Sequence, residues 1–185
     1  MPPLLPVRKP QGRGGKQINR AHSPLLAQVL PWLSVLAGSL IPGWMVIASA
    51  PIAPPLGFLA LLGWRQLRPG LLPVWAGLPL GLFDDLFSGQ PMGSAVLLWS
   101  LAMIVIELVE RFRPWRSPAL DWLLAAGLIA AYLFLSLLLA NAAGGSARLA
   151  VLAPGILIAV LVYPLIGRLI AWIDRQRLAR FRVIA

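Results

Sequence analysis

The chain has 185 residues, of which 59% are hydrophobic and only 12% are charged. Soluble domains typically carry about twice that charged fraction, so the composition excludes an ordinary water-soluble protein and indicates an integral membrane protein. The net charge of +10 would suggest nucleic-acid binding in a soluble chain. Here the cations lie mainly in short segments between apolar runs, where they act as topology signals, so no nucleic-acid partner is expected.

The first part of the chain predicts a tail followed by two unequal apolar elements. Residues 1–24 are basic and rich in Pro and Gly, and they lack the apolar content of a packed core, so we expect a disordered cytoplasmic tail. Residues 25–49 are long enough to cross a bilayer as a tilted helix that contains Pro31 and Pro42. The second run, 56–64, is short and predicts either a helix sheltered by its neighbours or a re-entrant element.

Four further apolar runs complete the predicted bundle. Trp64, at the end of the second run, is interpreted as an interfacial anchor next to two arginines. Residues 171–185 are basic and predict a cytoplasmic tail that begins as a continuation of the last helix. The sequence therefore predicts an all-α integral membrane protein with six transmembrane helices, one of them short, within residues 25–170. The four later runs are 70–87, 93–109, 120–140 and 149–170.

The distribution of cations predicts the orientation. All of the 16 Lys and Arg residues except Arg148 fall in the two tails, at the inner end of the last run, or in the segments after the second and fourth runs. Because cytoplasmic segments are enriched in Lys and Arg, both termini are expected in the cytoplasm. The outer surface then consists of three turns, 51–55, 88–92 and 141–148, each too small to form a domain.

Two adjacent carboxylates, Asp84 and Asp85, end the third run, and acids at membrane depth are functional candidates. A DDxxD magnesium site would need a third acid that this stretch lacks. Glu107 is predicted at the opposite depth, where it can snorkel towards the cytoplasm, and the only histidine, His22, precedes the first run. We therefore predict no catalytic residue, no metal site and no cofactor, and expect a protein that is not an enzyme.

The small residues of this region predict a tight helical hairpin. Gly77 and Gly81 form a GxxxG pattern, which lets two helices approach closely in a membrane. Ser88, Gly89 and Gly93 are interpreted as further points of close approach. The third and fourth helices are therefore expected to pack directly against each other.

The two carboxylates are expected to differ in role. Asp85 is predicted to accept hydrogen bonds from backbone N–H groups at the turn or at the start of the next helix, where the helix dipole favours an anion. Asp84, about 100° further round the helix, is expected to face the outer water or Arg148. The prediction is a hairpin anchored by Asp85.

This stretch resembles the signature of the MreD family of rod-shape-determining proteins. That signature is a Gly, a few apolar residues, an Asp, an apolar pair, a Ser-Gly and a turn that ends in Gly. Asp84 occupies a position that is usually apolar in the family, and Met92 stands where the family has Leu. The resemblance covers roughly residues 25–180, including the Arg68-Pro69 pair. The matching residues are Gly81, Asp85, Ser88, Gly89, Pro91 and Gly93.

The resemblance implies a non-enzymatic component of the bacterial cell-elongation machinery in the inner membrane. Such proteins partner MreC and act with MreB filaments, the RodA glycosyltransferase and its class B penicillin-binding transpeptidase in lateral peptidoglycan synthesis. Their fold is similar to that of the membrane subunits of energy-coupling-factor vitamin transporters. A vitamin-capturing transporter subunit therefore stays open as an alternative, and it would need an outer polar pocket. The sequence offers Asp84, Asp85, Asn141 and Ser146 for such a pocket.

Overall fold

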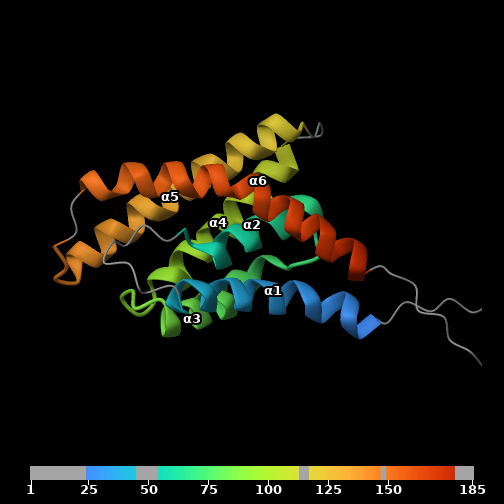
Figure 1. Ribbon diagram of the computed structural model, residues 1–185, viewed down its shortest axis with the longest axis horizontal. Coiled ribbons are helices and arrows are strands. Elements are labelled where there is room, and N and C mark those ends of the chain that lie inside the picture. Colours follow the sequence, from blue (N-terminus) through green and yellow to red (C-terminus); the bar gives the residue numbers. More distant parts are fainter. Residues whose placement is uncertain (1–23, 45–53, 113–116, 147–148, 178–185) are drawn as a thin grey trace, which may run out of the picture.

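The computed structural model describes residues 24–44, 54–112, 117–146 and 149–177 (Figure 1). These residues form six α-helices and two short 3-10 helices, and no strand occurs among them. The chain is therefore all-helical where it is described. The elements are α1 (Pro24–Trp44), α2 (Leu56–Leu67), η1 (Val74–Ala76), α3 (Gly77–Phe87), α4 (Ser94–Phe112), α5 (Pro118–Ala142), η2 (Leu149–Val151) and α6 (Leu152–Arg177).

The connections between helices gather at two opposite ends of the bundle (Figure 1). The start of α1, the end of α6 and the turn at 68–73 lie at one end, which we call the inner end. The turn at 88–93 and the end of α5 lie at the opposite, outer end. Successive helices therefore run in alternating directions.

Helices α5 and α6 are long and apolar enough to cross a membrane. At 1.5 Å per residue, 25 residues extend about 38 Å, whereas the hydrocarbon core of a bilayer is about 30 Å thick. Only 17% of the most apolar stretch of each helix is buried within the protein. Side chains such as Leu123, Leu161 and Leu165 point outwards and are exposed. An apolar surface of this kind is favourable in lipid and supports the prediction of a membrane protein.

Helix α2 lies at the centre of the bundle, where it contacts α1, α5 and α6. Every residue from Gly57 to Arg65 is buried. Helix α1 comes close to α2 because both carry glycine at the contact: a Cβ atom added to Gly38 would lie 2.9 Å from the backbone nitrogen of Gly57. The second apolar run is thus a short helix sheltered by its neighbours, the first of the two predicted possibilities.

The sequence predicted one continuous third run from residue 70, and this prediction is wrong for residues 70–73, which are not helical. Gly70 has a left-handed φ of 81°, and Pro73 is extended with ψ of 158°, so the chain is not helical there. Helix α3 consequently has only 11 residues and spans about 16 Å. The bundle therefore contains two short helices, α2 and α3, where the sequence predicted one.

The core is built mainly from large side chains of α2 and α4. Phe58 and Trp64 of α2 and Trp99 and Met103 of α4 are fully or almost fully buried. The indole N–H of Trp64 donates to the hydroxyl of Ser34 on α1, at 2.6 Å. The interpretation of Trp64 as an interfacial anchor is therefore wrong, because its side chain is fully buried between helices and does not lie on the surface.

The C-terminal helix extends beyond the apolar run. Helix α6 continues to Arg177, which confirms that the basic tail begins as a continuation of the last helix. Its Asp174 is buried and accepts hydrogen bonds from the Nε (3.0 Å) and Nη2 (2.9 Å) of Arg68, which follows α2. The predicted tails at 1–23 and 178–185 lie outside the described residues.

Candidate functional site

The hairpin between α3 and α4 is packed through the predicted GxxxG pattern. A Cβ atom on Gly77 would lie 2.9 Å from the backbone of Ser100, and one on Gly81 would lie 2.7 Å from the carbonyl oxygen of Ala95. Real Cβ atoms do not approach backbone atoms so closely, so only glycine allows this spacing of the two helices. The predicted close approach at Gly77 and Gly81 is confirmed.

Two other glycines of the motif serve the turn and not the helix contact. Gly89 and Gly93 have φ angles of 68° and 91°, in the left-handed region that residues with a Cβ atom rarely adopt. A Cβ atom on either would meet nothing within 4 Å. Their prediction as close-approach points is therefore wrong: the backbone conformation, and not a neighbouring helix, requires glycine at both positions.

Ser88 and Pro91 form the two sides of the same turn. The backbone N–H of Ser88 donates to the carbonyl oxygen of Asp84 at 2.8 Å, at the point where α3 ends. The carbonyl oxygen of Pro91 accepts from the N–H of Ser94 at 3.0 Å, where α4 begins. The side chain of Ser88 is exposed, so these two residues shape the connection through their main chains.

Asp85 connects the end of α3 to the start of α4 through its carboxylate, which is only 3% exposed. The carboxylate accepts backbone N–H groups from Gly93 (2.9 Å), Ala95 (2.8 Å) and Val96 (3.1 Å), and the hydroxyl of Ser94 (3.1 Å). The first N–H groups of a helix lack intrahelical acceptors and carry the positive end of its dipole, so an anion there is stabilised. The predicted role of Asp85 as the anchor of the hairpin is confirmed.

Asp84 occupies a different environment from the one predicted. It is only 7% exposed, so the expectation that it faces the outer water is wrong, and Arg148 lies outside the described residues. Helix α3 packs against α1, and Asp84 lies beside the buried hydroxyl of Ser39. That hydroxyl makes no hydrogen bond of normal geometry within the described part of the chain.

Tyr132 of α5 is a further buried polar residue at the outer end, near Asp84 and Ser39. The hydroxyl of Tyr132 accepts from the Nε2 of Gln90 at 3.3 Å, and its ring stacks on Phe58 with centroids 4.3 Å apart. Tyr132 also lies near Asp84 and beside the buried indole of Trp99. Sequence reasoning did not identify Tyr132, although a lone phenol in an otherwise apolar run was the available signal.

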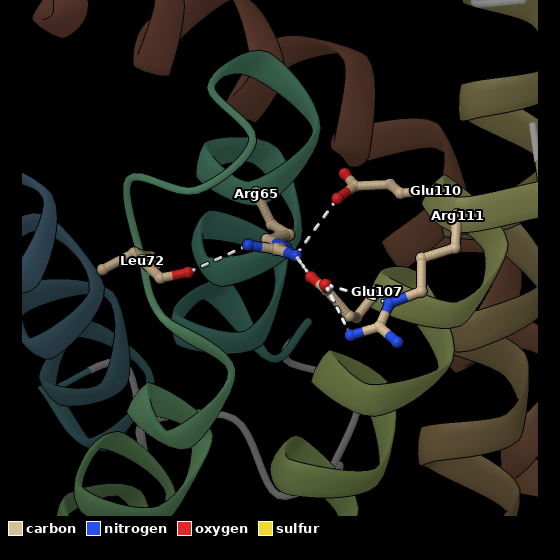
Figure 2. Close-up of polar contacts among 5 residues, drawn as sticks. All are labelled: Arg65, Leu72, Glu107, Glu110 and Arg111. Carbon is tan, nitrogen blue, oxygen red and sulfur yellow. Dashed lines mark hydrogen bonds and ion pairs between the residues drawn. The ribbon is translucent and has the colours of Figure 1, made fainter. Parts of the chain in front are cut away.

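The inner end carries a buried ion-pair cluster, shown in Figure 2. Arg65 of α2 is 2% exposed, and its Nη2 pairs with Glu107 and with Glu110 (3.1 Å) of α4. Its Nη1 donates to the carbonyl oxygen of Leu72 at 3.1 Å, and Arg111 pairs with Glu107 from the exposed side at 3.4 Å. The cluster joins α2, α4 and the turn at 68–73.

Sequence reasoning missed this cluster because it interpreted Arg65 as a topology signal and Glu107 as a snorkelling side chain. Glu107 instead turns towards Arg65 (Figure 2). The available signal was a pair of acids three residues apart, Glu107 and Glu110, at the inner end of an apolar run. Glu107 lies near the inner end of α4 and Asp85 beside its outer end, so the two do not form a relay.

A groove of about 300 Å³ opens at the inner end between α2, α5 and α6. Gln66 links the three helices, because its Nε2 donates to the backbone oxygen of Asp121 (2.9 Å) and its Oε1 accepts from the hydroxyl of Tyr163 (2.6 Å). Apolar atoms form most of the lining, to which Trp122 and Pro164 belong. The groove lies far from the hairpin motif.

Among the residues that the structure describes, no group of three His, Cys, Asp or Glu side chains is placed to hold a metal ion. Comparison of the chain with known protein families, with curated proteins and with solved structures gives no match. The hairpin and the buried polar groups at the two ends of α4 are therefore the features of the molecule that point to a function.

Proposed function

We propose that this protein is an MreD-type component of the bacterial inner membrane that binds MreC and helps to direct lateral peptidoglycan synthesis. The observation that carries the proposal is the hairpin between α3 and α4. Gly81 sets the helix contact, Asp85 caps α4, and Gly89 and Gly93 set the turn. The residues of the family-like motif thus form one rigid structural unit, as expected of a signature that maintains a binding surface.

The proposed topology has six spans with both termini in the cytoplasm. The alternating helices, with the start of α1 and the end of α6 at one end, support it (Figure 1). The short helices α2 and α3 each pack against a longer one, α1 and α4 respectively. The described arginines that report orientation all belong to inner segments, which supports cytoplasmic placement of that end. They are Arg65, Arg68, Arg111, Arg168, Arg175 and Arg177.

The proposed mechanism is association through helix faces and outer turns. Leu78, Leu82 and Leu86 are exposed at four-residue spacing along α3, so they form one apolar stripe on the outside of the hairpin. A transmembrane helix of MreC is the proposed occupant of this stripe, with membrane lipid covering the remaining apolar surface. The RodA glycosyltransferase, its class B transpeptidase and, indirectly, MreB filaments would be brought together by the same assembly.

Purification of the tagged protein from native membranes tests the proposal. We expect MreC-type and cell-wall-synthesis proteins to co-purify with it. Asp85→Ala should reduce their recovery, because the first turn of α4 loses its cap. Gly127→Ala in α5, where a Cβ atom meets nothing within 4 Å, is the control and should retain them. Consistent absence of both classes of protein would overturn the proposal.

The vitamin-transporter alternative predicts a polar pocket near the outer end. At that end Asp85 is saturated by α4, and Gln90 is bonded to Tyr132, so these groups bind within the chain. We therefore favour association over ligand capture. A radiolabelled vitamin-uptake screen separates the two, because uptake that depends on this protein would favour the transporter.

A further inference from the structure

The adjacent carboxylates of α3 are both buried, but only one has the partners that an ionised group needs. Asp85 accepts four hydrogen bonds from the start of α4. Asp84 is 7% exposed, and the donor that lies beside it is the hydroxyl of Ser39, which is itself 96% buried and without a hydrogen bond of normal geometry. The helix end that stabilises the charge of Asp85 is not available to Asp84.

The described groups that surround Asp84 offer no positive charge. Helix α3 contributes the anion Asp85, α1 contributes Ser39, and α5 contributes the neutral phenol of Tyr132. Trp99 of α4 and Phe58 of α2, which pack against Tyr132, are uncharged. Among the residues that the structure describes, the arginines belong to inner segments at the opposite end. An ionised Asp84 would therefore be a buried charge without a cation, next to a second anion.

We propose that Asp84 is a proton-binding site, which holds a neutral carboxylic acid beside the hydrogen-bonded carboxylate of Asp85. A carboxylic acid can both donate and accept a hydrogen bond, so it can satisfy the hydroxyl of Ser39, and it removes the repulsion between the two neighbours. The proton would exchange with the outer face, where the hairpin lies. This inference does not depend on the identity of the protein's partners.

Infrared spectroscopy of the full-length protein in lipid nanodiscs tests the proposal. We expect a C=O stretching band of a protonated carboxyl group at neutral pH, which shifts when aspartate carries a ¹³C-labelled side-chain carboxyl. The band should be lost in Asp84→Asn and kept in Asp85→Asn, and it should weaken as the pH is raised. The isotope shift in the unmodified chain needs no variant, so a folding defect cannot obscure the result. A wild-type spectrum without this band overturns the proposal.

Thermal unfolding gives an independent measurement. Asn has nearly the shape and the neutral charge of protonated Asp, so Asp84→Asn should leave the unfolding midpoint unchanged, whereas Asp85→Asn should lower it. An equal loss in both variants would contradict the proposal. Arg148→Gln tests the alternative that Asp84 forms an ion pair with Arg148. If the protonated-carboxyl band is absent in the wild type and appears in this variant, Asp84 pairs with Arg148 and is not a proton site.

Discussion

The two ends of α4 are held by charges of opposite sign, in different ways. At the outer end, the anion Asp85 binds the main-chain N–H groups that begin the helix. At the inner end, the cation Arg65 binds two side chains, Glu107 and Glu110, near the end of the helix (Figure 2). Both signs complement the dipole of α4, which is positive at its start and negative at its end.

The outer anchor depends mainly on backbone groups, whereas the inner anchor depends on side chains. Three of the four donors that bind Asp85 are backbone N–H groups, which persist when side chains are substituted, and the fourth is the hydroxyl of Ser94. The inner anchor depends on three side chains from two helices, so it can be broken from either side. It also buries a full cation, because Arg65 is 2% exposed whereas Glu107 and Glu110 are partly exposed.

The largest expected effect is at the inner anchor. Arg65→Met should lower the free energy of unfolding by about 3 kcal/mol, since it removes a buried cation that pairs with two carboxylates and donates to the carbonyl oxygen of Leu72. Chemical unfolding in detergent micelles measures it. Arg111→Met is the matched control, because Arg111 is 71% exposed. It should change stability by no more than about 0.5 kcal/mol. Equal effects of the two variants would show that burial of Arg65 is not what stabilises the cluster.

The outer anchor should come next. Asp85→Ala should cost about 2 kcal/mol, because four donors at the start of α4 lose a charged acceptor. Hydrogen exchange of the amides of Ala95 and Val96 should accelerate, while exchange near Met103 in the middle of α4 should change little. Unchanged protection at the helix start would contradict the capping role.

A smaller loss is expected from the helix contact between the two anchors. Gly81→Ala places a Cβ atom against the backbone of α4 and should cost about 1–2 kcal/mol by forcing the helices apart. Gly127→Ala, in α5, is the control, because a Cβ atom there meets nothing within 4 Å. It should be neutral or slightly stabilising, since Ala favours helix more than Gly. A loss of similar size in both variants would exclude a specific contact at Gly81.

The smallest effect should come from the half-exposed ion pair at the inner end. Arg68 is 49% exposed where it pairs with the buried Asp174, and Gln keeps a hydrogen-bond donor for that carboxylate, so Arg68→Gln should cost about 1 kcal/mol. Its stability loss should shrink with added salt, whereas that of Arg65→Met should change little, because screening acts mainly on exposed charges. Equal salt dependence of the two would contradict the difference in burial.

The parts of the fold that the sequence predicted are those governed by local pattern. The apolar runs of α5 and α6 are long and uninterrupted, and Asp85 directly precedes the turn to the helix that it caps. The extent of α3 was wrong, because Gly70 and Pro73 stop the helix within an apolar run that hydropathy alone describes as continuous. Hydropathy measures solvent preference and not backbone geometry.

The inner anchor could not be predicted because its members are distant in the sequence. Arg65 pairs with acids 42 and 45 residues away, and only the packing of α2 against its neighbours shows that it is buried. The same holds for Asp84, whose burial depends on α1, and for Tyr132, whose partner Gln90 lies 42 residues before it. Such contacts follow from tertiary packing, which charge and periodicity do not specify.

The central position of α2 has a consequence for how the protein enters a membrane. A helix of 12 residues extends about 18 Å and cannot cross a bilayer core of about 30 Å alone. It also carries Arg65, whose charge would be costly in lipid before Glu107 and Glu110 arrive. Insertion of α2 is therefore coupled to the arrival of α4, so the chain must hold an incomplete intermediate until more than a hundred residues have been synthesised. Biogenesis of this protein should accordingly depend on a chaperone or insertase that shelters α2 during that interval.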